Sequence, residues 1–169
     1  KTDPLPREVR GTYAQIALDF VQTAISGMLS ERLSEIARQA DAPFSGASVS
    51  FGPFLVANTK DALSLDVMMK ENRSAEGIKA AYRELLRASR GGFTVSEYER
   101  FKQEYLSQID AAYEARDKRT NTSLVDACVR NFLDNVPAPG IEWLHSAMHQ
   151  FVPNFPLEVI NKTLAALPQ

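Results

Sequence analysis

The sequence predicts a two-layer α/β (α+β) domain that is rich in helices and has only a partial antiparallel sheet. Over most of the chain, apolar residues recur every three or four positions, as they do in amphipathic helices. One stretch, 46–70, turns instead to β-branched and aromatic residues and then to alternation, which is typical of a hairpin. Because two strands alone make a poor sheet, we expect the flanking strands to lie outside this chain.

The composition is that of an ordinary globular protein. The 169 residues are 44% hydrophobic and 24% charged, with a net charge of −2. This balance lacks the basic surface of a nucleic-acid-binding protein, and no apolar run approaches the roughly 20 residues that span a bilayer. The chain opens with Lys1 rather than methionine. We expect a piece of a longer polypeptide, with residues 1–6 as a linker and 7–169 as one domain.

The first predicted helix covers residues 7–40. Phe20, Met28 and Leu33 contribute to its apolar stripe, and charged residues such as Arg32 occupy other faces. A proline at position 43 ends it. Two strands follow, over about 46–57 and 62–70, and a polar turn at 58–61 joins them into an antiparallel pair.

The rest of the chain predicts helices with recognisable ends. Ser74 is expected to be the N-cap of the first, and Gly91 with Gly92 terminates it. Thr94 and Glu97 form a capping box that begins the next. The predicted helices cover residues 75–90, 95–118, 120–134, 141–150 and 157–167, with a hinge at 137–140 and prolines at 153 and 156 separating the last two.

Two histidines form the one constellation that resembles a catalytic site. His145 and His149 lie four residues apart on one helix face, the spacing at which two imidazoles share a zinc ion in HExxH and HxxEH motifs. The acid of these motifs is missing, because Ser146 and Met148 occupy its two positions, and neither can act as a general base.

The pair also lacks a third ligand nearby in sequence. Glu142 lies one turn before His145 and is a weak candidate, while Glu158 follows beyond two prolines. We therefore expect no catalytic, cofactor-binding or metal site in this chain, and name only His145 and His149 as candidate ligands. Amphipathic-helix histidines near a surface are the simpler interpretation.

Two other features have ordinary structural explanations. Cys128, the only cysteine, lies on the apolar face of a predicted helix, where a cysteine is usually buried and inert. The charged runs 98–102 and 114–119 are expected to be solvated helix faces, or alternatively a surface that contacts a peptide or a neighbouring domain.

Six sequence blocks follow one another along the chain: 28–37 (MLSERLSEIA), 42–44 (APF), 92–98 (GFTVSEY) with Lys102, 114–118 (EARDK), 129–133 (VRNFL) and 139–142 (PGIE). Taken in this order, they resemble the insulinase/pitrilysin family of zinc peptidases, whose relatives include the mitochondrial processing peptidase. The resemblance covers nearly the whole chain. It implies the second, so-called inactive, domain of the N-terminal half of such an enzyme, with a fold like that of the mitochondrial processing peptidase.

The resemblance implies that zinc and the HxxEH motif belong to a catalytic domain preceding Lys1. His145 and His149 fall at the far end of the second domain and do not correspond to the family's zinc histidines. The family's C-terminal half carries an arginine and a tyrosine in an LRxxxQLGY-like stretch. The comparable stretch here, 33–41, has Ser34 at the arginine position and no tyrosine. No family catalytic residue is therefore carried onto this chain.

The implied function is a non-catalytic domain that supports the catalytic domain and lines a peptide-holding chamber in a zinc peptidase. Its partners would be the upstream catalytic domain, the downstream half of the same polypeptide and the peptide substrate. The alternative is an interaction or scaffold module from a catalytically dead homologue, which self-associates through its open sheet edge. The bacterial character of the resemblance and the single cysteine favour the periplasm, with the cytoplasm as the alternative.

Overall fold

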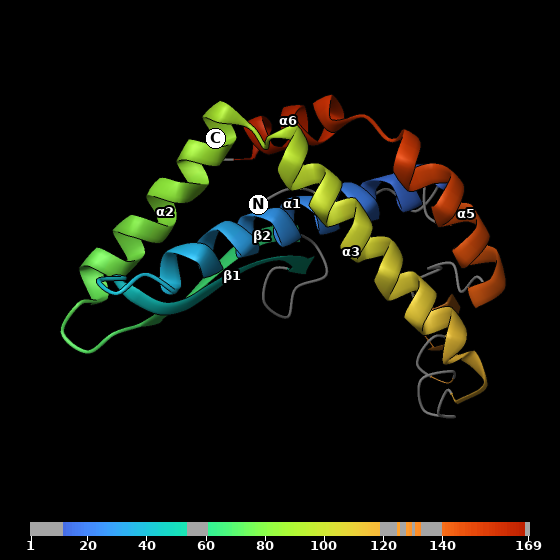
Figure 1. Cartoon of the computed structure of the whole chain (residues 1–169), viewed down its shortest axis with the longest axis horizontal. Coiled ribbons are helices and arrows are strands. Elements are labelled where there is room, and N and C mark those ends of the chain that lie inside the picture. The colour runs from blue at the N-terminus through green and yellow to red at the C-terminus, as the bar shows by residue number, and fades with distance from the viewer. Residues whose placement is uncertain are drawn as a thin grey trace. The chain divides into compact units, whose positions relative to one another are not determined.

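The computed structural model describes residues 12–53, 61–118 and 140–167, with positions 125, 128, 129, 131 and 132 (Figure 1). The predicted linker, residues 54–57 of the first predicted strand, residues 58–60 of the turn predicted over 58–61 and most of the helix expected over 120–134 lie outside the described residues. The hinge does too, except for Gly140. Contacts divide the described residues into two compact units. The first comprises 19–98 and 157–167, and the second comprises 12–18 and the described part of 99–156. The single domain expected over 7–169 stays a prediction.

The first unit contains the predicted hairpin. Strand β1 (Phe44–Pro53) pairs antiparallel with β2 (Asp61–Met69), and the register shifts once, between Phe44 and Gly46. From residue 63 to residue 68 of β2, half-buried side chains alternate with exposed ones, which agrees with the predicted alternation. Among the described residues no third strand joins the sheet. The fold class is therefore confirmed as helix-rich α+β with a small antiparallel sheet.

One face of α1 (Tyr13–Ala37) supplies much of the core of the first unit. Ser30 links the helix to the sheet, because its hydroxyl oxygen accepts a hydrogen bond of 3.0 Å from the Val49 N–H. The predicted apolar stripe is confirmed, since the buried side chains recur at three- and four-residue steps. These are Phe20, Val21, Ala24, Ile25, Met28, Leu29 and Leu33.

Helix α2 (Ser74–Gly91) packs against both strands, and α6 (Leu157–Ala166) packs against α2 (Figure 1). The close approach of α2 to the start of β1 depends on Gly77. A Cβ atom there would lie 3.2 Å from the Pro43 carbonyl oxygen. The apolar side chains of α2 are only partly buried, because Ala81 and Leu85 are buried while Ile78 and Tyr82 are exposed.

The predicted cap of α2 is wrong by one residue. Ser74 is the first residue of the helix, and Arg73 occupies the cap position without a capping side-chain bond. The Arg73 guanidinium instead donates to Glu76 at 2.7 Å and to the Asp41 carbonyl at 3.2 Å. The start of the helix is thus held by an ion pair and a tertiary contact rather than by a serine hydroxyl.

Helix α3 (Val95–Glu114) begins in the first unit, and its residues from Glu99 onward belong to the second unit. A short 3-10 turn, η2 (Arg116–Lys118), follows it. The helix predicted over 95–118 therefore ends four residues early. Helix α5 (Ile141–Asn154) extends past its predicted end and includes Pro153 in its last turn. Pro153 therefore does not separate α5 from α6 as predicted. In the last turn of a helix, a proline removes only the one backbone hydrogen bond that its missing N–H would have donated. No helix in the described part of the chain is long and apolar enough to cross a membrane.

Candidate functional site

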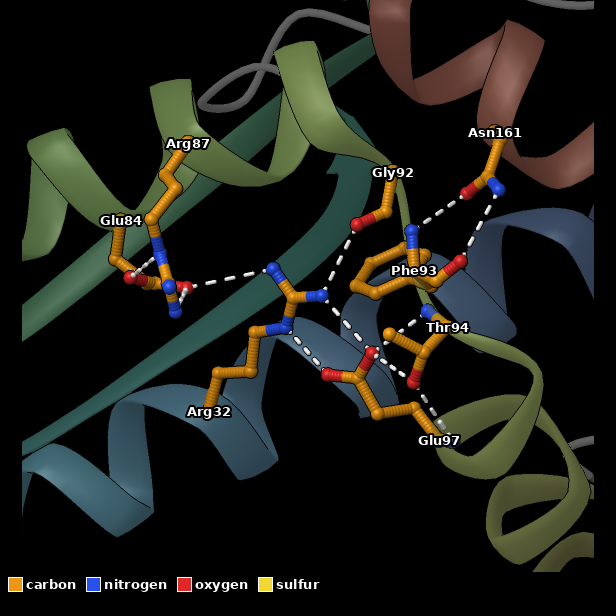
Figure 2. A network of polar contacts seen from close by, with 8 residues as sticks. All are labelled: Arg32, Glu84, Arg87, Gly92, Phe93, Thr94, Glu97 and Asn161. Carbon is orange, nitrogen blue, oxygen red and sulfur yellow. Dashed lines mark hydrogen bonds and ion pairs between the residues drawn. The ribbon is translucent and has the colours of Figure 1, made fainter.

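Arg32 is the centre of a polar network in the first unit (Figure 2). Its Nε and Nη2 donate to the two carboxylate oxygens of Glu97, the second at 2.9 Å. Nη2 also donates to the Gly92 carbonyl at 3.0 Å, and Nη1 lies 3.4 Å from Oε1 of Glu84. The guanidinium carbon lies 5.0 Å from the centre of the Phe93 ring. One arginine of α1 therefore joins α2, the turn after it and the start of α3.

Glu97 is held in its charged form by this network. The predicted capping box is confirmed: the Thr94 N–H donates to Glu97 at 2.7 Å, and the Glu97 N–H donates to the Thr94 hydroxyl at 3.3 Å. The hydrogen bond from Arg32, followed by those from the Thr94 N–H and hydroxyl, lowers the pKa of Glu97 to about 2, although burial opposes this. The same pairing raises the pKa of Arg32.

Asn161 of α6 closes the network from the other side. Its Oδ1 accepts a bond of 2.8 Å from the Phe93 N–H, and its Nδ2 donates to the Phe93 carbonyl at 3.2 Å (Figure 2). Gly92, with φ of +70°, lies directly beneath this amide. Any Cβ at Gly92 would lie 2.8 Å from Asn161. The network therefore holds α1, the turn after α2, the start of α3 and α6 together. Glu97 and Arg32 are both ionised at neutral pH and are paired with each other.

The two predicted candidate ligands come together in the second unit with a carboxylate that sequence reasoning missed. Nε2 of His145 and Nε2 of His149, both on α5, lie 2.8 and 2.7 Å from the same oxygen, Oδ1 of Asp110 on α3. The three potential ligand atoms all lie within 4.8 Å of one another. Hydrogen bonds from His149 and then from His145 lower the pKa of Asp110. No spacing signal could have found Asp110, because 35 residues separate it from His145.

Neighbouring rings hold His145 in place. Tyr113, one turn after Asp110, stacks on His145 with ring centres 4.4 Å apart and planes at 27°. Arg116, from the charged run 114–119, lies over Tyr113 at 4.4 Å and donates to its carbonyl at 2.9 Å. Arg116 is thus packed against Tyr113, whereas residues 114, 115, 117 and 118 of the run are exposed, as expected of a solvated face.

The carboxylates weighed as third ligands do not join the cluster. Glu142 turns its Oε2 back toward Gly140 at the start of α5, and Glu158 belongs to the first unit. The residues also do not fit the family's catalytic zinc site, since Met148 occupies the position of the HxxEH acid and is buried.

The prediction that Cys128 is buried is wrong, because the side chain is exposed. Other apolar residues of the same segment are exposed as well: Val125, Val129 and Phe132. An apolar helix face is buried only where another element packs on it, and none of the described elements covers this one.

The fold is that of one section of a much larger protease chain. No protein-family profile matches the sequence, and no curated protein matches it. Two of the solved structures that match are those of the periplasmic protease PqqL from Escherichia coli. Its first half aligns with a TM-score of 0.81 and 14% identity over 99% of this chain, and the complete protein with 0.81 and 15% over 91%. This chain spans about a third of the first and about a sixth of the second. The likeness supports the insulinase-like fold that the sequence resemblance implied.

Proposed function

We propose that this chain is a non-catalytic structural domain of an insulinase-like zinc peptidase and lines the chamber that holds the peptide substrate. One observation carries the proposal. The fold of PqqL extends over 99% of this chain, yet the matched section is only 34% of the first-half structure. A supporting domain would be expected to match in this way, as one section of a larger protease structure.

The chemistry of the described residues supports a non-catalytic role. The Arg32 network joins ionised groups that are already paired, so it has no free acid or base for proton transfer at neutral pH. The histidine pair has no carboxylate at the base position of an HxxEH motif. In the parent enzyme the zinc ion, which would activate water for attack on the peptide carbonyl, would be held by residues that precede this chain.

The partners and the cellular location of the chain follow from the same proposal. Its partners would be the upstream catalytic domain, the downstream half of the polypeptide and the peptide. PqqL is described as a periplasmic protease, which supports a periplasmic location for the parent, with the cytoplasm as the alternative.

A second candidate function is a protein-interaction or scaffold module from a catalytically dead homologue. It is favoured by the two-stranded sheet, which has no further strand on either edge among the described residues. Exposed apolar side chains on β2 and on the adjoining α2 also favour it: Met68 of β2 is 70% exposed, and Ile78 and Tyr82 of α2 are 50% and 48% exposed. An edge of this kind recruits further strands, from a partner or from a second copy.

A peptidase assay tests the main proposal. The 169-residue chain is incubated with zinc and a library of quenched fluorescent peptides, beside the His145→Ala/His149→Ala double variant as the matched control. We expect no cleavage above the blank by either protein. Hydrolysis that EDTA abolishes and that the double variant lacks would show a catalytic chain instead.

The reading frame before Lys1 separates the two candidates. An HxxEH motif followed by a distant glutamate supports the peptidase, whereas an α/β domain without that motif supports the scaffold. Sedimentation of the chain at high concentration tests the open edge, and a strictly monomeric chain contradicts self-association through it.

A further inference from the structure

We propose that Asp110, His145 and His149 form a metal site that binds one zinc ion and clips α3 to α5. The proposal is independent of the peptidase role, because the site is distinct in sequence and composition from an HxxEH centre. The sequence-based expectation of no metal depended on the lack of a third ligand. Asp110 supplies this third ligand, since its Oδ1 lies within 2.8 Å of Nε2 of both histidines.

The ligand atoms already converge on one point. His145 Nε2 and His149 Nε2 lie 2.8 and 2.7 Å from Asp110 Oδ1, and the two imidazole rings lie 4.6 Å apart between centres. Zinc bonds of about 2.0 Å at tetrahedral angles separate neighbouring ligand atoms by roughly 3.3 Å. The ion would be admitted by side-chain rotations that widen the two contacts with Asp110 by about half an ångström and set the two Nε2 atoms, which lie within 4.8 Å of each other, at the same spacing.

The proton balance of binding is simple. In the metal-free cluster the Nε2–H groups donate to the carboxylate. For zinc to bind, each neutral imidazole would exchange its Nε2 proton with water and take one up on Nδ1, so that no net proton is released and the Nε2 lone pair faces the ion. Asp110 contributes a negative charge. Two nitrogens and one carboxylate oxygen form a ligand set that suits zinc, and the remaining position takes a water molecule.

The surroundings suit a structural clip. The side chains of His145, His149 and Asp110 are 28%, 40% and 47% exposed, so an ion can enter without unfolding. Tyr113 stacks on His145 and restricts its ring. Asp110 and His145 are 35 positions apart, so the ligands come together only in the folded chain. Zinc would therefore bind the folded state preferentially and stabilise it.

Zinc titration of the 169-residue chain tests the site. Every protein carries Cys128→Ser, because an exposed thiol can bind added zinc by itself and would obscure the titration. Calorimetry measures stoichiometry and affinity, and the visible spectrum of Co²⁺ in place of zinc measures coordination. The variants are Asp110→Asn and His149→Ala, with Asp117→Asn as the matched control, since Asp117 is an exposed carboxylate outside the cluster. Far-UV circular dichroism checks that each variant is folded.

We expect one zinc per chain, a Co²⁺ spectrum with nitrogen and oxygen ligands, and a melting temperature raised by roughly 5 °C or more at a hundredfold excess over the dissociation constant. Asp110→Asn and His149→Ala should each weaken binding by at least about tenfold, while Asp117→Asn should not. Lack of saturable binding, or equal affinity in folded Asp110→Asn, would overturn the proposal.

Discussion

The substitution Glu97→Gln tests the Arg32 network most directly. It keeps the shape of the side chain and part of the capping box but removes the negative charge that Arg32 faces through two hydrogen bonds. Both side chains are largely buried, at 13% exposed for Arg32 and 17% for Glu97. Removing one partner of a buried pair leaves the other charge uncompensated, which is more costly than losing a surface ion pair.

The magnitude follows from the pKa of Glu97, which falls from its ordinary value of 4.5 to about 2. At about 1.4 kcal/mol for each pH unit, the charged form is favoured in the folded state by about 3 kcal/mol. Because the folded-state pKa is the lower one, this stabilisation is complete above pH 4.5. It is lost as the pH falls from 4.5 to about 2.

Urea unfolding followed by circular dichroism measures the free energy of unfolding between pH 2.5 and 7. We expect Glu97→Gln to lower it by about 3 kcal/mol at pH 7, and the gap to the unmodified chain to narrow below pH 4.5. Glu31→Gln is the matched control, because Glu31 and its ion-pair partner Arg38 are 48% and 69% exposed, so its loss should cost under about 0.5 kcal/mol. A Glu97→Gln chain that is as stable as the control, with an unchanged pH profile, would refute the reasoning.

Two further predictions concern single positions. Gly92→Ala should destabilise the chain by about 2 kcal/mol, because φ is +70° and the new Cβ would collide with Asn161. Gly91→Ala is the control and should be neutral or slightly stabilising, since a Cβ there meets nothing within 4 Å. Equal melting temperatures for the two variants would contradict the close contact. Cys128, being exposed, should react with a thiol reagent such as DTNB in the folded chain at the rate of the urea-unfolded chain, to within about tenfold. Protection by several orders of magnitude would mean that the thiol is buried after all.

Elements with a short-range signature could be predicted from the sequence. The stripe of α1 and the capping box of Thr94 and Glu97 depend on residues at most a few positions apart, and both are confirmed. The hairpin is confirmed for the same reason, because alternation along β2 indicates one covered face. Ends were less predictable. Ser74 has a side chain suited to an N-cap, but Arg73 occupies that position. Arg73 pairs with Glu76 and donates to the Asp41 carbonyl, and the second contact depends on a segment more than 30 positions away.

The sequence alone determined the class of fold and its local elements, because helix and strand periodicity and helix caps are written in neighbouring residues. Only the tertiary structure decided which charged groups meet. Arg32 pairs with Glu97 across 65 positions, and Asp110 lies between two histidines 35 and 39 positions further on. The same holds for Cys128, whose exposure depends on whether another element covers its helix face. Contacts of this kind have no periodic signature, since they arise only when folding brings distant segments together.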